Sequence, residues 1–178
     1  MKVVFITRST LHSVPGGDTQ QVLQTARMLK MLQVEVDIKL THEKIDYKKY
    51  DLLHFFNIIR PADILVHIQR CDRPFVVSAI WIDYSVYDQQ QRKGFAGKLL
   101  RILPKGSIEY AKTIYRWLMR KDKLVSKSYL WKGQRSSIRY IMKKAAGIFV
   151  QSKDEYHDLV KQYAVKSPFT VIQNGIRS

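Results

Sequence analysis

The sequence predicts an α/β protein in which a doubly wound, Rossmann-like parallel sheet of about six strands forms a single domain. Short runs rich in Val, Ile and Phe recur along the chain without polar alternation, as expected of strands that are buried on both faces. Amphipathic segments of helical length separate most of these runs, and this alternation indicates parallel strands joined by right-handed crossovers. The 178 residues are enough for one domain with a sizeable core.

The predicted elements follow one another along the chain. The first strand, residues 2–7, is an almost uninterrupted apolar run. We expect the other strands within residues 34–40, 50–59, 73–85, 145–152 and 169–174. Helical periodicity predicts helices over residues 19–33, 60–71 and 153–164, with shorter helical pieces between residues 85 and 145.

Local signals indicate where these helices begin. Asp18 or Thr19 is the expected N-cap of the first helix, and Pro61 opens the second, where its missing N–H is tolerated. Ser152, followed by Glu155 three residues later, predicts a capping box for the last helix. The first helix is expected to bury one broad apolar stripe, made up of Val22, Leu23, Ala26, Met28, Leu29 and Leu32.

Cysteine usage and hydropathy bear on the location of the protein. Cys71 is the single cysteine, so no internal disulfide can form, which suits a reducing compartment. The N-terminal apolar run extends only from Val3 to Ile6, which is too short for a signal peptide. No window approaches the roughly 18–20 apolar residues that a membrane span needs. We therefore expect a cytoplasmic protein. We also expect it to be held peripherally at the inner face of the cell membrane.

The membrane expectation comes from the distribution of charge. The chain has 31 basic and 15 acidic residues and a net charge of +16. Residues 89–146 contain sixteen of the bases but only two acids, Glu109 and Asp122. The sequence therefore describes a nearly neutral domain with one strongly basic helical insert.

Three interpretations of this insert stay open. Its apolar and basic residues recur at helical spacing, which is typical of helices that lie on an anionic membrane surface. A solvated charged face is the ordinary alternative, and interleaved aromatic residues also permit nucleic-acid binding, the least favoured of the three. The membrane interpretation predicts a lipid-facing set that consists of Phe95, Lys98, Leu99, Arg101, Trp117 and Arg120.

Ligands of an open parallel sheet bind beyond the carboxyl ends of its strands, and this rule selects the candidate site. Gly16 and Gly17 precede the first helix, where they either admit a phosphate to the backbone N–H groups or only form the turn. Asp83 closes the fourth strand and is a candidate catalytic base or sugar ligand, or else a helix cap. Trp81 either packs or stacks on a sugar ring. Ser152 caps a helix whose N-terminus is also able to bind an anion.

Other residues and motifs narrow the chemistry. His54 lies within a predicted strand, so we expect a core histidine and not a base. There is neither a G-x-G-x-x-G nor a G-K-[ST] motif, which argues against NAD and ATP. No group of His, Cys and acidic residues has the spacing of metal ligands, and we predict no metal and no cofactor.

The motifs, taken in order, resemble a known family. They are "MKVVFIT", "PGGDTQQVLQTARMLKMLQVEVDI", "YDLLHFFN", "RPFVVSAIWIDYS", "AAGIFVQSKDEYHDLV" and "VIQNGI". This order resembles the N-terminal half of GT-B glycosyltransferases, and more narrowly the retaining group 1 family. That family includes glycogen synthases, sucrose synthases and many bacterial enzymes that build lipids and polysaccharides. The resemblance covers residues 1–177 apart from the basic insert.

The resemblance implies roles for particular residues. Gly16 and Gly17, with Asp18 and Thr19, would face phosphates or the acceptor in an interdomain cleft. Asn57, Asp83 and Ser152 would line the acceptor side, and the implied substrate-binding set also includes Trp81, Tyr84 and Asn174. Residues 1–175 would be the acceptor-binding domain, and residues 176–178 would begin a linker to a C-terminal domain.

The resemblance also implies the reaction. A sugar would pass from a nucleoside diphosphate sugar, bound mainly by the C-terminal domain, to a hydroxyl of a lipid-linked or polysaccharide acceptor. The family often has His where this chain has Trp81-Ile82-Asp83, and Gln173 replaces a usual Pro. On this interpretation the 178 residues alone have no transferase activity. The alternative is a non-enzymatic Rossmann-like module that binds nucleic acid through its basic insert.

Overall fold

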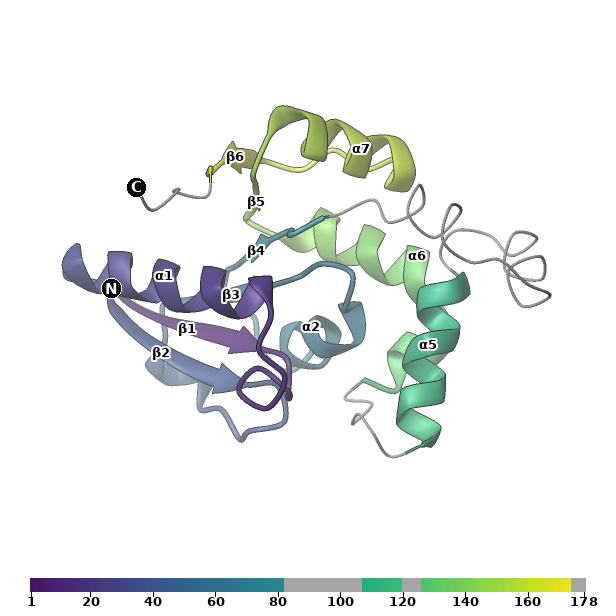
Figure 1. Cartoon of the computed structure of the whole chain (residues 1–178), viewed down its shortest axis with the longest axis horizontal. Helices are drawn as coiled ribbons and strands as arrows, with labels where there is room; N and C mark the ends of the chain where they lie inside the picture. Colours follow the sequence, from purple (N-terminus) through teal and green to yellow (C-terminus); the bar gives the residue numbers. More distant parts are fainter. Residues whose placement is uncertain (82–106, 120–125, 174–178) are drawn as a thin grey trace.

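The computed structural model describes residues 1–81, 107–119 and 126–173 and shows an α/β domain (Figure 1). The strands are β1 (Lys2–Thr7), β2 (Glu35–Leu40), β3 (Leu52–Phe56), β4 (Phe75–Ser78), β5 (Gly147–Val150) and β6 (Phe169–Val171). The helices are α1 (Gly17–Met31), α2 (Pro61–Ile68), α5 (Ser107–Leu118), α6 (Ser128–Lys144) and α7 (Lys153–Tyr163), with a 3-10 turn η1 (Tyr47–Lys49) before β3.

The described strands form one six-stranded sheet in the order β2-β1-β3-β4-β5-β6, and all pairs are parallel. The predicted parallel, Rossmann-like architecture is thereby confirmed. The chain leaves β1 toward β2 on one side and returns to β3 on the other, so the strand order reverses between β1 and β3. This topological switch point is where open α/β sheets form their ligand crevices.

Helices cover both faces of the sheet. Val3, Phe5 and Phe56 belong to a small core with Val22 and Ala26 of α1. A larger core on the opposite face joins the sheet to α2, α6 and α7, and it includes Val4, Leu53, Phe55, Val77, Ile138, Ile141, Ile148 and Leu159. Consecutive residues of β1 and β3 alternate between these two cores, which is why their sequences are apolar without interruption.

Several strands are shorter than the sequence predicts. β3 ends at Phe56 because Asn57 adopts the left-handed conformation, with φ of 67°, and its Oδ1 accepts a hydrogen bond from the Ile59 N–H at 3.2 Å. β4 ends at Ser78, and Ile80 has φ of 47°. β-branched residues rarely adopt this conformation, so the sequence carried no sign that the extended backbone would stop here. The apolar run continues past Ser78, and the strand was therefore predicted too long.

The start and the buried face of α1 also differ from the prediction. The N-cap is Gly16, and Asp18 and Thr19 lie in the first turn. Leu23, Met28 and Leu32 were expected in the core but are exposed. The buried stripe is narrower than predicted because α1 packs on the sheet along one side only.

The basic segment is helical in pieces, as predicted. The backbone of α6 departs from helical geometry at Gly133, where φ is 66° and ψ is 178°. Of the predicted lipid-facing residues, Trp117 lies on α5 and is exposed, whereas Phe95, Lys98, Leu99, Arg101 and Arg120 fall outside the described residues. Among residues 1–81, 107–119 and 126–173, no helix has the length and hydropathy that crossing a bilayer requires.

Candidate functional site at the carboxyl edge of the sheet

The switch point between β1 and β3 is flanked by the first turns of two helices. β1 leads through residues 8–16 into α1, and β3 leads through residues 57–60 into α2. These helices lie against opposite faces of the sheet, and both N-termini are at its carboxyl edge (Figure 1). The partial positive charge of a helix N-terminus favours anions, so the edge combines two such ends.

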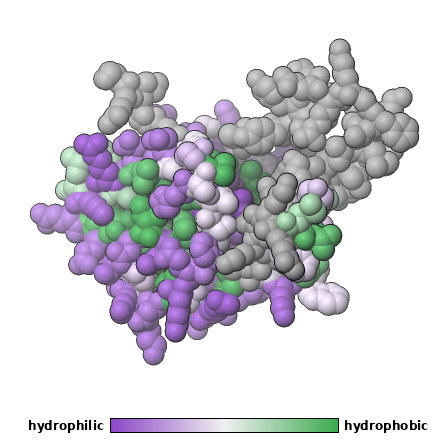
Figure 2. All heavy atoms as spheres, turned by 60° about the horizontal axis from the view of Figure 1, so that its bottom comes forward, coloured by the Kyte–Doolittle hydropathy of each residue, from purple (hydrophilic) through white to green (hydrophobic). Residues whose placement is uncertain are grey.

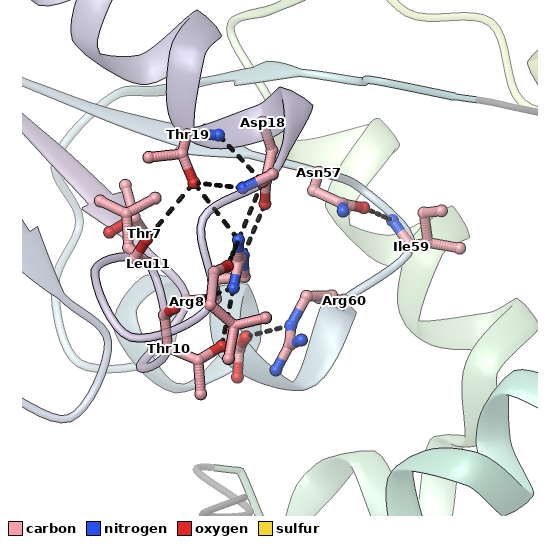
Figure 3. A network of polar contacts seen from close by, with 12 residues as sticks. Thr7, Arg8, Thr10, Leu11, Asp18, Thr19, Asn57, Ile59 and Arg60 are labelled. Carbon is pink, nitrogen blue, oxygen red and sulfur yellow. Dashed lines mark hydrogen bonds and ion pairs between the residues drawn. The ribbon is translucent and has the colours of Figure 1, made fainter.

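Arg8, the first residue after β1, organises the loop that leads to α1 (Figure 3). Its Nε and Nη2 donate to the two carboxylate oxygens of Asp18, at 2.6 and 3.0 Å. Its Nη1 donates to the carbonyl and the hydroxyl oxygen of Thr10, and its Nη2 also donates to the Val14 carbonyl at 2.7 Å. Arg8 therefore acts as a structural clamp, with its charge balanced by Asp18.

Asp18 is ionised in this environment. Burial favours the neutral acid, but the hydrogen bond and the positive charge of Arg8 outweigh it, and the pKa of Asp18 lies below its ordinary value. The Thr19 N–H, at 2.9 Å from Oδ1, and the more distant charge of Arg60 act in the same direction. The carboxylate is thus bound by groups of its own loop and helix and is not a candidate general base.

Gly16 and Gly17 have different surroundings. A Cβ at Gly16 would lie 3.2 Å from Asp18 Oδ1 and 3.7 Å from Arg8 Nη2, so glycine lets the loop pass close to the clamp. The Gly16 N–H donates to Thr19 Oγ1 at 3.1 Å. A Cβ at Gly17 would meet nothing within 4 Å among the residues that the structure describes. Open space therefore lies in front of the first residue of α1, where a ligand could approach the backbone.

The β3 side of the edge is formed by Asn57 and Arg60. The Asn57 N–H donates to the Ser78 carbonyl at 2.9 Å, which holds the end of β3 against β4. Arg60 is the N-cap residue of α2, and its Nε donates to Asp63 Oδ2 at 2.8 Å. Figure 3 shows Asn57 and Arg60 across the switch point from the Arg8–Asp18 clamp. This side contributes an amide and a guanidinium group to the same edge.

A second group of predicted residues lies further along the edge, between β4 and β5. Glu155 accepts hydrogen bonds from the Trp81 N–H at 2.7 Å and from the Gln151 N–H at 2.5 Å. Ser152 Oγ accepts from the Glu155 N–H at 3.1 Å, so the predicted N-cap is confirmed. In a capping box the Glu155 carboxylate would accept from the N–H of Ser152 itself. Here it accepts from the N–H of Gln151, one residue earlier, and its other oxygen accepts from Trp81 in the chain after β4.

Trp81 is half-buried and packs with its ring edge-on to Tyr163, with 5.6 Å between the centroids. Its Nε1 is buried and has no hydrogen-bond partner in the part of the chain that the structure describes. The packing alternative of the sequence analysis is therefore met at this residue.

His54 is a core residue, as expected. Its ring stacks on Phe56 with 4.3 Å between centroids, and its Nε2 lies 2.8 Å from Ser78 Oγ. Burial lowers the pKa of His54 to about 3, so the ring is neutral at physiological pH. A second buried histidine, His67, is bracketed by the hydroxyls of Thr41 and Tyr47, and burial lowers its pKa to about 4. Neither ring lies where it could serve as a surface base.

The candidate residues thus fall into two groups and an undescribed remainder. Gly16, Gly17, Asp18, Thr19 and Asn57 come together at the switch point, and Trp81 and Ser152 lie between β4 and β5. Asp83, Tyr84 and Asn174 lie outside the described residues. Arg8 lies at a predicted strand end but received no predicted role, and Arg60 and Glu155 were not among the predicted site residues, although Arg60 directly precedes the helix that Pro61 was predicted to open.

Metal binding and relationships to known proteins add little to this geometry. Within the described ranges, no group of three or more His, Cys, Asp or Glu residues is arranged to hold a metal ion. The sequence matches no known protein-family model, and no curated protein matches it. A functional proposal consequently depends on the fold, the site and the motif order.

Proposed function

We propose that this chain is the acceptor-binding half of a retaining GT-B glycosyltransferase. The complete enzyme would move a sugar from a nucleoside diphosphate sugar to a hydroxyl of a lipid-linked or polysaccharide acceptor. The observation that carries the proposal is the position of the Gly-Gly loop. It opens α1 at the switch point of an all-parallel sheet, with open space in front of Gly17. The resemblance in motif order supplies the reaction.

The edge suits a phosphate-bearing ligand on physical grounds. The N-termini of α1 and α2 both favour negative charge, and Arg60 adds a guanidinium group that is paired through its Nε with Asp63. In glycosyl transfer negative charge develops on the departing diphosphate, and fixed dipoles and cations that face it lower the barrier. Arg8 takes part indirectly, because its guanidinium holds the loop that positions Gly16 and Gly17.

The diphosphate of a lipid-linked acceptor would lie at the Gly-Gly loop, and its sugar along the remainder of the edge. Asn57 at the end of β3 has a side chain that can bind a sugar hydroxyl through its amide N–H, since its Oδ1 already accepts from Ile59. The N-terminus of α7, capped by Ser152, would be the next anion-binding end. Asp83 is the proposed catalytic base. The donor sugar would be held mainly by a second Rossmann-like domain.

Isothermal titration calorimetry can test this assignment. The probes are a short-chain polyprenyl diphosphate sugar, the same sugar without the diphosphate lipid, and a nucleoside diphosphate such as UDP. We expect the chain to bind the first probe, to lose most of this binding in a Gly17→Val variant, and to bind UDP weakly. Binding of UDP stronger than binding of the lipid-linked sugar, or binding unaffected by Gly17→Val, would overturn the assignment to the acceptor half.

The alternative, a nucleic-acid-binding module, is tested with the same preparation. A fluorescent single-stranded oligonucleotide is titrated at low and at physiological salt. The transferase proposal expects only weak binding that disappears with salt, because charge alone would drive it. Salt-resistant binding of the oligonucleotide together with no response to the sugar probes would instead favour the binding module.

A further inference from the structure

Helix α5 presents an apolar stripe to solvent. Ala111, Tyr115 and Leu118 follow one another at spacings of four and three residues, so they lie on one side of the helix. All three are exposed, and Leu118 is 72% exposed. Trp117 and Met119 are exposed at the same end of the helix. Figure 2 shows green and pale spheres at the corner of the molecule where α5 lies.

The exposure of this stripe is not due to a detached helix. Another side of α5 packs on α6, where Tyr110 lies against the ring of the fully buried Tyr129 at 5.3 Å between centroids. The Tyr110 hydroxyl donates to the Leu130 carbonyl at 3.0 Å. Thr113 and Ile114 are half-buried next to this contact. One face of α5 is therefore anchored while the stripe faces outward.

The first turn of α6 adds a further exposed aromatic side chain. Trp131 is 92% exposed and lies two residues before the kink at Gly133. Its backbone is fixed on both sides. Tyr129 donates to Gln134 Oε1 at 2.5 Å, and Gln134 Nε2 donates to the Ile59 carbonyl at 2.7 Å. An indole held in water by a rigid backbone has not buried its apolar surface in this fold.

The same two helices carry a strong excess of positive charge. Residues 107–144 contain eleven Lys and Arg residues and two acids, Glu109 and Asp122. The exposed bases in the described part of this segment are Lys127, Lys132, Arg135, Lys143 and Lys144. Exposed apolar side chains on a segment with many bases and few acids are characteristic of surfaces that lie in the headgroup region of an anionic bilayer.

We propose that the exposed residues of α5 and of the first turn of α6, namely Tyr115, Trp117, Leu118, Met119 and Trp131, form a docking surface for an anionic lipid bilayer. The aromatic and aliphatic side chains would enter the headgroup boundary, and the surrounding bases would neutralise acidic lipids. Leu118 and Met119 distinguish this partner from a nucleic acid, because aliphatic side chains neither stack on bases nor pair with phosphates. The proposal does not depend on the transferase assignment.

Co-sedimentation of the full 178-residue chain with vesicles tests the proposal. The vesicles contain either phosphatidylcholine alone or phosphatidylcholine with 30% phosphatidylglycerol. We expect binding to the anionic vesicles, at least about tenfold weaker binding to the neutral ones, and a loss of about tenfold or more in a Leu118→Gln/Trp131→Gln double variant. Met31→Gln is the matched control, because Met31 is 70% exposed on α1, away from the proposed surface. It should bind within about twofold of the unaltered chain.

Circular dichroism and thermal unfolding establish that each variant is folded before vesicles are added. Raising the salt concentration should weaken binding without abolishing it, since salt screens the bases but not the apolar contacts. Three outcomes would overturn the proposal: no binding of the unaltered chain to the anionic vesicles, unchanged binding of the folded double variant, or an equal loss in Met31→Gln. A single-stranded oligonucleotide that bound more tightly than the vesicles and was lost in the double variant would identify a nucleic-acid surface instead.

Discussion

Arg8 binds both carboxylate oxygens of Asp18, at 2.6 and 3.0 Å, and so joins the end of β1 to the first turn of α1. The two side chains are 12% and 16% exposed, so water screens the pair poorly. The contact brings together residues that are ten positions apart, across the loop that contains Gly16 and Gly17. The shape of the candidate site therefore depends on an ion pair between two side chains that bind each other.

Removal of one member of this pair should destabilise the fold. Arg8→Met leaves the partly buried Asp18 carboxylate without its main partner, and we expect the free energy of unfolding to fall by about 2–4 kcal/mol. Urea denaturation measures this change. Lys49→Met is the matched control, because Lys49 forms only a solvent-exposed pair with Asp46 at 3.9 Å, and it should cost no more than about 0.5 kcal/mol. Equal losses in the two variants would contradict a structural role for the clamp.

The two glycines of the loop should respond differently to substitution. Gly17→Ala places its methyl group in open space at the start of α1, so we expect unchanged thermal stability together with weaker binding of the polyprenyl diphosphate sugar probe. Gly16→Ala forces a contact with Asp18 Oδ1, and we expect a loss of about 1 kcal/mol in the free energy of unfolding. Thermal unfolding and calorimetry of both variants check the prediction. A larger loss of stability in Gly17→Ala than in Gly16→Ala would count against it.

Glu155 should matter more for stability than the Ser152 cap beside it. Ser152→Ala removes one hydrogen bond at the N-terminus of α7 and should cost about 1 kcal/mol. Glu155→Ala leaves the N–H groups of Trp81 and Gln151 without their acceptor, and we expect about 2 kcal/mol or more. Denaturant unfolding of both variants gives the comparison. The interpretation fails if Ser152→Ala is the more destabilising change.

The buried histidines should make the fold sensitive to mild acid. The pKa of His54 is lowered to about 3 in the folded chain, whereas the ordinary value is 6.5, so the unfolded chain binds the proton first as the pH falls. The contribution of neutral His54 to stability is complete above pH 6.5 and is lost progressively toward pH 3. Between pH 7.5 and 5.5 this linkage lowers the free energy of unfolding by about 1.4 kcal/mol.

A variant isolates this contribution. His54→Phe substitutes a ring that cannot titrate for the imidazole. The surrounding cluster already contains Phe5, Phe56 and Phe149. Urea denaturation gives the free energy of unfolding at pH 7.5 and at pH 5.5. The difference between these two values should be smaller in His54→Phe than in the unaltered chain by about 1.4 kcal/mol. Leu32→Ala, at an exposed position, is the control and should keep the full difference. An unchanged difference in His54→Phe would mean that His54 has the same pKa in the folded and the unfolded chain.

Much of the fold was predictable because buried parallel strands require apolar sequences on both faces. This requirement identified β1 to the residue and located the other strands, although the predicted end of the fourth strand, residue 85, lies well beyond the end of β4 at Ser78. The errors have local causes. Asn57 and Ile80 adopt left-handed conformations after β3 and β4, and apolar residues continue past both points, so hydropathy alone could not place the strand ends.

The candidate site was predictable only in outline. Topology directed attention to the strand ends, and therefore to Gly16, Gly17, Asn57 and Ser152. Topology did not reveal that Glu155 holds the chain after β4. Glu155 does so by accepting a hydrogen bond from the Trp81 N–H, which lies 74 positions away in sequence. Local patterns correctly predicted its place in the first turn of α7 but not the second partner of its carboxylate.

The sequence by itself determined the α/β class, the parallel sheet and the concentration of positive charge in one segment, because these follow from residue types and their periodicity along the chain. Only the tertiary structure decided that Arg8 is neutralised by Asp18 and that His54 is neutral. It also decided that Leu118 and Trp131 stay in water beside an anchored face. Each of these outcomes depends on which groups the fold brings within hydrogen-bond distance or excludes from solvent, and such proximity is not encoded in any short stretch of sequence.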